Sequence, residues 1–317
     1  MDPLRYLHDD HVFLRREALE HGHTDDDLQM CLRHGVIVRI RQGAYTFADV
    51  WTAADDVERH RLRAHAVLRS HTTPIALSHT SAAVEHGLRL FQPDLRRVHV
   101  TCLDQPIART TRDIVYHQGA CPDGDLVRHD GQLTVAPARA ALEAASLADT
   151  VSGLVVLDSL VDLGLGSLEE VYAGFERFAG WPNSRKLQIT VRLARVGAGS
   201  VGETLGRYLM WTQHLPEPEL QFEVRDRWGH LIGVTDFAWP EYRLLGEFDG
   251  MAKYGRLLKD GETPGQAVER EKNREDALRE ETGWLMVRLI WAELFDAPRT
   301  GAKIRRQLNR GRSLVVA

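Results

Sequence analysis

The stretch that decides the fold of the carboxy-terminal part is VTDFAWPEYRLLGEFDG, residues 234–250. Two apolar runs flank Pro240-Glu241, and this pattern predicts a β-hairpin because proline presets the first central position of a turn. With a two-residue loop, Asp236 stands opposite Leu245 and is a diagonal neighbour of Glu247 on the other strand. The register of this hairpin therefore decides which acids meet.

Strand alternation places Asp236, Glu247 and Asp249 on one face of the hairpin. A shift of one residue would move Glu247 to the other face and remove the pairing. Carboxylates are rarely buried among apolar residues without a partner. A bound Mg²⁺ or Mn²⁺ ion would supply one, since hard cations prefer oxygen ligands. The alternative is an ordinary solvated sheet face on which acids alternate with apolar residues.

The elements around the hairpin indicate an α/β core. Upstream, residues 199–211 are predicted to form a helix in which Ser200 is the N-cap and Glu203 completes a capping box. Downstream, residues 266–281 form a charged helix, with Ala267, Glu271, Arg274 and Leu278 at helical spacing. A strand over 283–291 and a short helix from Ala292 follow.

This order of elements resembles the PD-(D/E)XK (restriction-endonuclease-like) nuclease superfamily, and most closely the small domain related to very-short-patch repair endonucleases. The motifs that carry the resemblance are DFAWP at 236–240, EFDG at 247–250 and GWLMVRLIW at 283–291. It covers roughly Gly199 to Leu308. The resemblance implies a metal site with Asp236 and Glu247 as ligands and Glu203 as a further ligand or water-orienting group.

One departure from the family pattern concerns the catalytic cation. The superfamily has Lys two residues after the second acid, where this chain has Asp249. A cation near the scissile phosphate stabilises developing charge. Lys272, on the following helix, is the preferred candidate for that role, and Lys253 is the second. The alternative is that both lysines are solvated surface groups.

The amino-terminal part is predicted to be a winged helix-turn-helix. Its helices span residues 11–21 and 25–34, the second capped by Thr24, and a hairpin over 36–47 turns at Gln42-Gly43. The run LRHGVIVRIRQGAY, residues 32–45, is similar to the amino-terminal domain of AbiEi-type antitoxins.

That resemblance implies DNA binding, with Arg33, Arg39 and Arg41 at the basic positions of the motif. The departure is the acidic run 25–27, because carboxylates at the end of a recognition helix repel phosphates, and specific readers usually present Arg, Lys, Asn or Gln. The alternative is a packing or dimerisation module that does not contact DNA.

The middle region reads as mixed α/β and resembles the middle region of AbiEi-type proteins. The expected elements are helices over 75–87, 134–145 and 151–163 and strands over 98–101 and 114–117. His79 and Arg139 are candidates for a structural polar pair or a nucleotide-sensing site. The structural role is favoured because a buried histidine usually finds a hydrogen-bond partner.

Composition limits the protein class. The 317 residues carry a net charge of −5, so nucleic-acid contacts must come from local basic patches. Three cysteines without zinc-ligand spacing are typical of a protein of the cytoplasm, where thiols stay reduced. No apolar run is long enough for a membrane span. We therefore expect no membrane partner.

The predicted domains are a winged helix over 1–72, a mixed α/β middle region over 73–180 and a PD-(D/E)XK-like domain over 181–317. The expected function is metal-dependent DNA endonuclease activity in phage defence or repair. The alternative is a non-catalytic, DNA-binding regulator of AbiEi type with a cognate toxin as partner. Asp249 in place of the signature lysine favours the regulator, whereas the set Glu203, Asp236 and Glu247 favours the enzyme.

Overall fold

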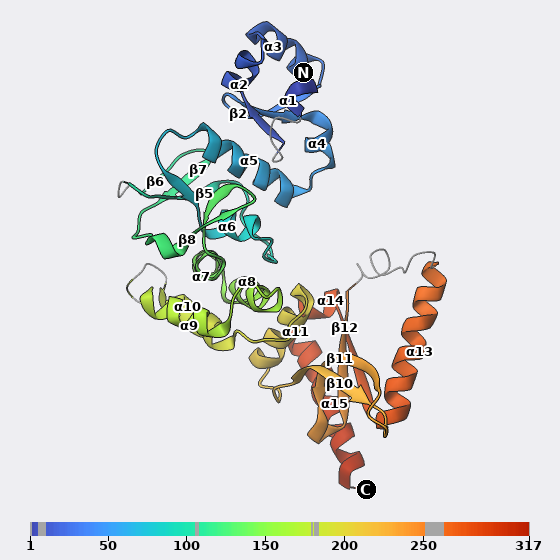
Figure 1. The fold of residues 1–317 in the computed structure, drawn as a ribbon. Helices are drawn as coiled ribbons and strands as arrows, with labels where there is room; N and C mark the ends of the chain where they lie inside the picture. Colours follow the sequence, from blue (N-terminus) through green and yellow to red (C-terminus); the bar gives the residue numbers. More distant parts are fainter. Residues whose placement is uncertain are drawn as a thin grey trace. The chain divides into compact units, whose positions relative to one another are not determined.

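The protein is a mixed α/β chain whose computed structural model describes residues 2–5, 11–104, 108–178, 180, 184–250 and 263–316 (Figure 1). Its backbone divides into two compact units, Met1–Ala194 and Arg195–Ala317. The sequence-based boundary at 180/181 lies before α10 (Ser184–Leu193), and α10 packs on α7, α8 and α9 of the first unit. The first unit contains two sheets and the second contains one, and each unit is described by itself.

The chain begins with a small sheet surrounded by short helices. The elements are α1 (Asp2–Arg5), β1 (Val12–Leu14), α2 (Arg15–Glu20), α3 (Asp25–Arg33), β2 (Ile37–Arg41), β3 (Ala44–Phe47) and α4 (Ala48–Ala53), and the strand order is β1-β3-β2. The turn between β2 and β3 falls on Gln42 and Gly43 as predicted, with Gly43 at φ 72°. The predicted helix start at His11 was wrong, because all three residues of β1 are buried and pair with β3.

Helix α5 (Asp56–Ser70) joins this small sheet to the next one. Its Leu62 and Ala66 pack with Val12, Leu14 and Ala44 in one cluster. Its Ala64 and Val67 belong to a second cluster, built on the six-stranded sheet that follows. The expected domain boundary after residue 72 therefore follows directly after α5, a helix that packs against both sheets. This shared helix explains why residues 1–194 form one unit.

The six-stranded sheet has the order β6-β7-β5-β4-β9-β8. Its strands are β4 (Ile75–Leu77), β5 (Val98–Cys102), β6 (Arg109–Thr110), β7 (Ile114–His117), β8 (Leu126–His129) and β9 (Gln132–Val135). The helices are α6 (His79–Glu85), η1 (Asp123–Asp125), α7 (Pro137–Leu147), α8 (Thr150–Asp162), α9 (Leu168–Arg177) and α10. Residues 75–77, predicted as helix, form a strand because they pair with both β5 and β9.

The second unit is built on a four-stranded sheet of order β10-β11-β12-β13. Its elements are α11 (Val201–Thr212), β10 (Glu219–Arg225), β11 (Leu231–Trp239), η2 (Pro240–Tyr242), β12 (Leu244–Asp249), α13 (Pro264–Thr282), β13 (Leu285–Ile290), α14 (Trp291–Leu294) and α15 (Ala297–Val316). Strands β10 to β12 are antiparallel, and β13 runs parallel to β12. Strand β10 is the one element of this sheet that was not predicted.

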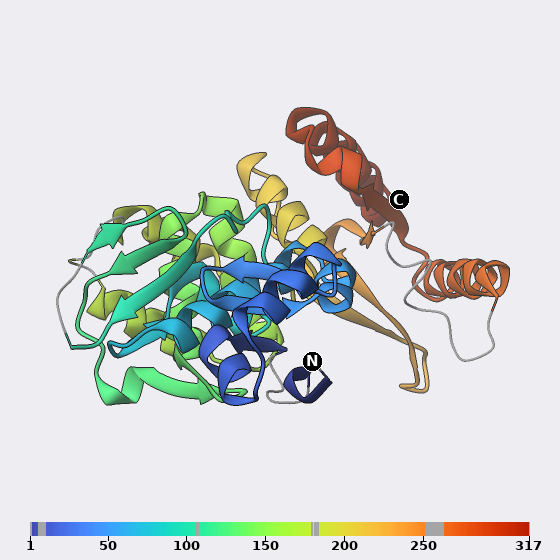
Figure 2. The same cartoon turned by 90° about the horizontal axis from the view of Figure 1, so that it is seen from above.

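Helices cover both faces of this sheet (Figures 1 and 2). On one face, Leu278 of α13 packs with Val224, Ala238 and Leu245. On the other face, α11 approaches so closely that a Cβ at Gly202 would lie 1.9 Å from the Phe248 ring. Only glycine fits there, so this sequence position fixes how near α11 lies to β12. No helix in the described ranges is long and apolar enough to cross a bilayer.

Candidate functional site

The hairpin between β11 and β12 confirms the expected arrangement of the three carboxylates on one face. Ala238 pairs with Leu245 and Trp239 with Leu244, a register shifted by two residues from the expected one. The cause is a longer loop, since η2 and Arg243, which is left-handed at φ 48°, replace a two-residue turn. An even shift preserves the faces.

Continuing that register places Asp236 directly opposite Glu247, closer than the diagonal arrangement that was expected. The carboxylate of Asp236 accepts a hydrogen bond from the backbone N–H of Phe248 at 2.7 Å. Asp236 is therefore held against β12 beside Glu247. Glu247 is 6 % exposed, so its carboxylate lies almost out of water.

Arginines meet these acids. Arg274 of α13 donates to Glu247 Oε1 at 2.6 Å and to the carbonyl of Val234 at 3.0 Å. Arg288 stands beside Glu247 on the parallel strand β13 and lies 3.9 Å from Asp249. Arg288 also forms an ion pair with Glu275 of α13. The face is thus a network of alternating charge between the sheet and α13, rather than a purely acidic patch.

Glu203 has a different environment. Its carboxylate accepts hydrogen bonds from Gly199 N–H at 2.9 Å, Ser200 Oγ–H at 2.7 Å and Gln221 Nε2 at 3.1 Å. Its N–H donates to Ser200 Oγ at 3.2 Å, so Ser200 is the N-cap as predicted. The backbone N–H that binds the Glu203 carboxylate belongs to Gly199 and not to Ser200, so the expected capping box is formed only in part. Within the described chain, none of these partners is a hairpin carboxylate, so Glu203 holds the start of α11 to β10.

In the structure, Arg274 rather than Lys272 contacts the hairpin carboxylates. Lys272 lies on α13 with an exposed side chain, and Lys253 falls outside the described residues. Arg274, two residues beyond Lys272, turns inward with Leu278, as the helical spacing of these two positions predicted. The sequence signal for this position is the four-residue spacing of Arg274 and Leu278, which places both on one side of the helix.

The donor atoms on this face suit a hard divalent cation in kind, because all are carboxylate oxygens. Among the described residues, however, no group of three or more His, Cys, Asp or Glu side chains is arranged to hold a metal ion. Glu247 Oε1 is engaged by Arg274 instead. A cation that used this oxygen would have to displace the guanidinium.

The three arginines expected to contact DNA differ in their surroundings. Arg33 and Arg39 are exposed, as DNA contacts require. Arg41 is half-buried, forming an ion pair with Asp113 at 3.1 Å and donating to Ser70 Oγ at 2.6 Å. Alternation along a regular strand would place Arg39 and Arg41 on the same outward face. The strand pairing is irregular between these two residues, which explains why only Arg39 is exposed.

The acidic run 25–27 is used within its own helix. Asp27 accepts from the Thr24 N–H at 2.8 Å, and this backbone hydrogen bond lowers the pKa of Asp27. Asp25 accepts from Arg15 Nε at 2.7 Å, and the hydrogen bond lowers its pKa. Capping and ion pairing therefore account for two of the three carboxylates that argued against DNA contact.

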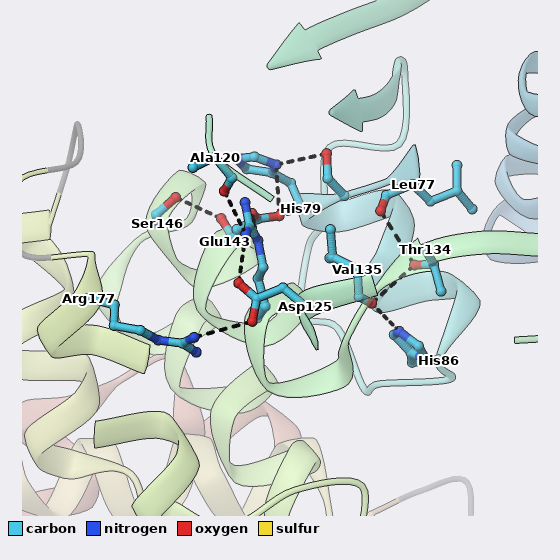
Figure 3. Close-up of polar contacts among 12 residues, drawn as sticks. Leu77, His79, His86, Ala120, Asp125, Thr134, Val135, Glu143, Ser146 and Arg177 are labelled. Carbon is cyan, nitrogen blue, oxygen red and sulfur yellow. Dashed lines mark hydrogen bonds and ion pairs between the residues drawn. The ribbon is translucent and has the colours of Figure 1, made fainter. Parts of the chain in front are cut away.

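A buried ion network joins His79 to Arg139 through Glu143, and Figure 3 labels His79, Glu143 and Asp125 within it. Glu143 accepts from the His79 N–H at 3.0 Å and from Arg139 Nε at 2.7 Å. Arg139 also donates to Asp125 at 2.9 Å and to the Ala120 carbonyl at 3.0 Å. Glu143 is 2 % exposed, and its burial raises its pKa despite the guanidinium. The network ties α6, α7 and η1 together, as the structural role of this pair predicted.

Three histidine rings lie beside this network. The His79 and His117 rings stack with centroids 3.6 Å apart, and His99 Nδ1 lies 2.9 Å from His117 Nε2. Burial lowers the pKa of His99 to about 3 and that of His117 to about 4. The cluster is therefore uncharged at neutral pH. No local sequence pattern predicts this cluster, because the three histidines come from the separate elements α6, β5 and β7.

The comparisons with known proteins extend along most of the chain. No family model matches it. It is 27% identical over 296 residues to the uncharacterized proteins MT2308 and Rv2248 of two Mycobacterium tuberculosis strains, a match that covers 91% of this chain and 98% of each relative. A search of solved structures finds the RV2827C protein of the same species, with a TM-score of 0.38 and 16% identity over 57% of this chain and 72% of that one. A TM-score this low does not establish a shared fold or function.

Proposed function

We propose that the second unit is a PD-(D/E)XK-like domain that hydrolyses DNA phosphodiesters with Mg²⁺ or Mn²⁺, and that the amino-terminal part is a DNA-binding winged helix. The observation that carries the proposal is the shared face of Asp236, Glu247 and Asp249, with Asp236 opposite Glu247 in the register. The order α11, β11, β12, α13, β13 also supports it, because the resemblance was argued from this order of elements; β10, between α11 and β11, is an addition to it.

In this proposal each side chain on the face has a distinct task. Asp236 and Glu247 hold the cation, and Asp249 extends the ligand set. The cation, when bound, would activate a water and polarise the phosphate. Arg274, which already reaches this face, takes the role first expected of Lys272: its guanidinium stabilises charge on the phosphate.

A second candidate function is a non-catalytic DNA-binding regulator of the AbiEi type, with a cognate toxin as partner. The observation that favours it is the pairing of Glu247 with Arg274 at 2.6 Å and of Asp249 with Arg288 at 3.9 Å. Such pairs neutralise the acids without a metal, as expected of a nuclease-like domain that only binds.

A cleavage assay separates the two functions. Full-length protein is incubated with duplex, single-stranded and mismatched DNA in the presence of Mg²⁺ or Mn²⁺. We expect cleavage that is lost in Asp236→Asn and Glu247→Gln but retained in Glu241→Gln, a loop variant with the same change of charge. No cleavage of any substrate, together with unchanged DNA binding by both site variants, would favour the regulator.

The winged helix is tested by binding rather than by cleavage. Replacing Arg33 and Arg39 with Ala should weaken binding to all sequences and lower the log–log salt slope by about two, one for each lost phosphate contact. Arg41→Ala is the matched control, because this side chain is already bound to Asp113. Equal effects of all three substitutions on the slope would contradict the assignment.

A further inference from the structure

Helix α15 concentrates positive charge in an acidic protein. The whole chain carries a net charge of −5, yet the 20 residues of α15 contain neither Asp nor Glu. Its cations are Arg299, Lys303, Arg305, Arg306, Arg310 and Arg312. A solvated helix usually mixes both signs along its exposed face, so this composition requires an explanation.

The helix separates its apolar and basic residues onto opposite sides. Ile304 and Leu308 are 0% and 2% exposed, which places them in the core. Arg299, Arg306 and Arg310 are exposed, and their spacings of seven and four residues align them along one side. At a rise of about 1.5 Å per residue, this arginine line is about 16 Å long.

Contacts within the unit occupy other cations of the helix but not this line. Lys303 forms an ion pair with Glu293 at 2.7 Å, and Arg305 donates to the Gln213 carbonyl at 2.7 Å. In the part of the chain that the structure describes, the guanidinium groups of Arg299, Arg306 and Arg310 have no carboxylate partner. Three planar cations are therefore presented to solvent in a row.

We infer that the arginine line is a binding surface for the phosphate backbone of a nucleic acid. Guanidinium groups donate two parallel hydrogen bonds to phosphate oxygens, and a row of them matches a regular row of negative charges. A lipid surface is the weaker fit. A helix that lies on a membrane needs a free apolar side, and α15 has already buried Ile304 and Leu308 against its own unit.

This surface is distinct from the carboxylate face. Helix α15 packs with α11 and α14, whereas α13 covers the acids from the other side of the sheet (Figures 1 and 2). The inference shares one premise with the proposed function, namely that the ligand is a nucleic acid. It does not require that the protein hydrolyse this ligand. It predicts binding that is independent of base sequence, because phosphates carry no sequence information directly.

The test measures binding of a fluorescent DNA duplex to the full-length protein over a range of salt concentrations. The variant is Arg299→Gln/Arg306→Gln/Arg310→Gln, which keeps three polar side chains on the exposed side of α15. The matched control is Arg185→Gln/Lys186→Gln/Arg192→Gln on α10, where three exposed cations are removed with the same change in net charge. Circular dichroism checks that both variants fold.

We expect the α15 variant to bind at least about tenfold more weakly at 0.1 M salt, and its log–log salt slope to fall by up to about three. The α10 variant should match wild type. Equal weakening of both variants would indicate a general charge effect and overturn the inference, as would unchanged binding by the α15 variant. Loss of binding to phosphatidylserine vesicles with unchanged DNA binding would assign the line to a membrane instead. Asp236→Asn should retain the salt slope even where it abolishes cleavage, which separates this inference from the hydrolytic proposal.

Discussion

The buried network around Glu143 and the carboxylate face around Glu247 use the same chemistry in opposite ways. Both pair an almost fully buried glutamate with an arginine, at 2.7 Å for Arg139 and 2.6 Å for Arg274. The side chain of Arg139 is 2% exposed, whereas that of Arg274 is 28% exposed. A guanidinium enclosed on all sides cannot be exchanged for a ligand, but one at the surface can. The Arg139–Glu143 pair is therefore enclosed, whereas the Arg274–Glu247 pair can be reached from solvent on its arginine side.

The largest expected effect comes from removing Arg139. Arg139→Met leaves Glu143 buried without its guanidinium and should reduce the free energy of unfolding by about 3–5 kcal/mol. The matched substitution Arg274→Met should cost less, about 1 kcal/mol, because the Arg274 side chain is 28% exposed and water can take its place beside Glu247. Urea denaturation, with hydrogen exchange to assign transitions to each unit, measures both.

The double variant Arg139→Met/Glu143→Leu is the control for this comparison. It removes both charges from the same space and should be more stable than Arg139→Met alone. If Arg139→Met and Arg274→Met reduced the free energy of unfolding equally, the proposed difference between an enclosed and an accessible ion pair would be wrong.

The next effect is acid sensitivity of the first unit. In the folded state His99 and His117 have pKa values of about 3 and about 4, below the ordinary value of 6.5. The unfolded chain therefore binds protons first, and the stability present above pH 6.5 is lost as pH falls toward 4. The loss is on the order of 1 kcal/mol per pH unit for each histidine.

Thermal melts from pH 7 to pH 4.5 measure this loss, and His99→Gln/His117→Gln provides the comparison. The variant should have a shallower dependence of melting temperature on pH than wild type, whatever its stability at pH 7. His60 and Asp94 also face His99, so their substitution to Gln and Asn tests whether neighbours share the effect. An identical slope in wild type and the histidine variant would contradict the prediction.

A smaller effect should follow from competition between Arg274 and a metal for Glu247. Arg274→Met releases Glu247 Oε1, so Mn²⁺ should bind more tightly and stabilise the variant more than wild type. Tenfold tighter binding corresponds to about 1.4 kcal/mol at saturating metal. Thermal shifts at increasing Mn²⁺ measure it, and Glu247→Gln should abolish the shift. Cleavage should nevertheless fall in Arg274→Met, since the proposed charge on the phosphate is removed.

The smallest effect is expected at Lys272. Its exposed side chain lies off the inward stripe of α13, so Lys272→Ala should change stability by less than about 0.5 kcal/mol. Metal-dependent thermal shifts and cleavage should match wild type. A drop in cleavage with unchanged metal binding would return the catalytic cation to Lys272 and remove Arg274 from that role.

Local patterns predicted the elements that local physics controls. The Gln42-Gly43 turn, the caps at Thr24 and Ser200, and the inward stripe of α13 follow from turn geometry, helix ends and helical periodicity. The common face of the three carboxylates was predicted because an error of two residues in register leaves strand faces unchanged.

Burial and long-range pairing decided the rest. Residues 12–14 and 75–77 became strands because partners far along the chain pair with them, which a short apolar run cannot indicate. The sequence by itself determined that acids line one strand face, that α13 is rich in both charges and that α15 carries only positive charge. Only the tertiary structure decided which arginine binds Glu247, that Glu203 binds Gln221 of β10, and that the rings of His79, His99 and His117 lie together. Those outcomes depend on how separate elements pack against one another. The spacing of residues along the chain does not determine the distances between packed elements.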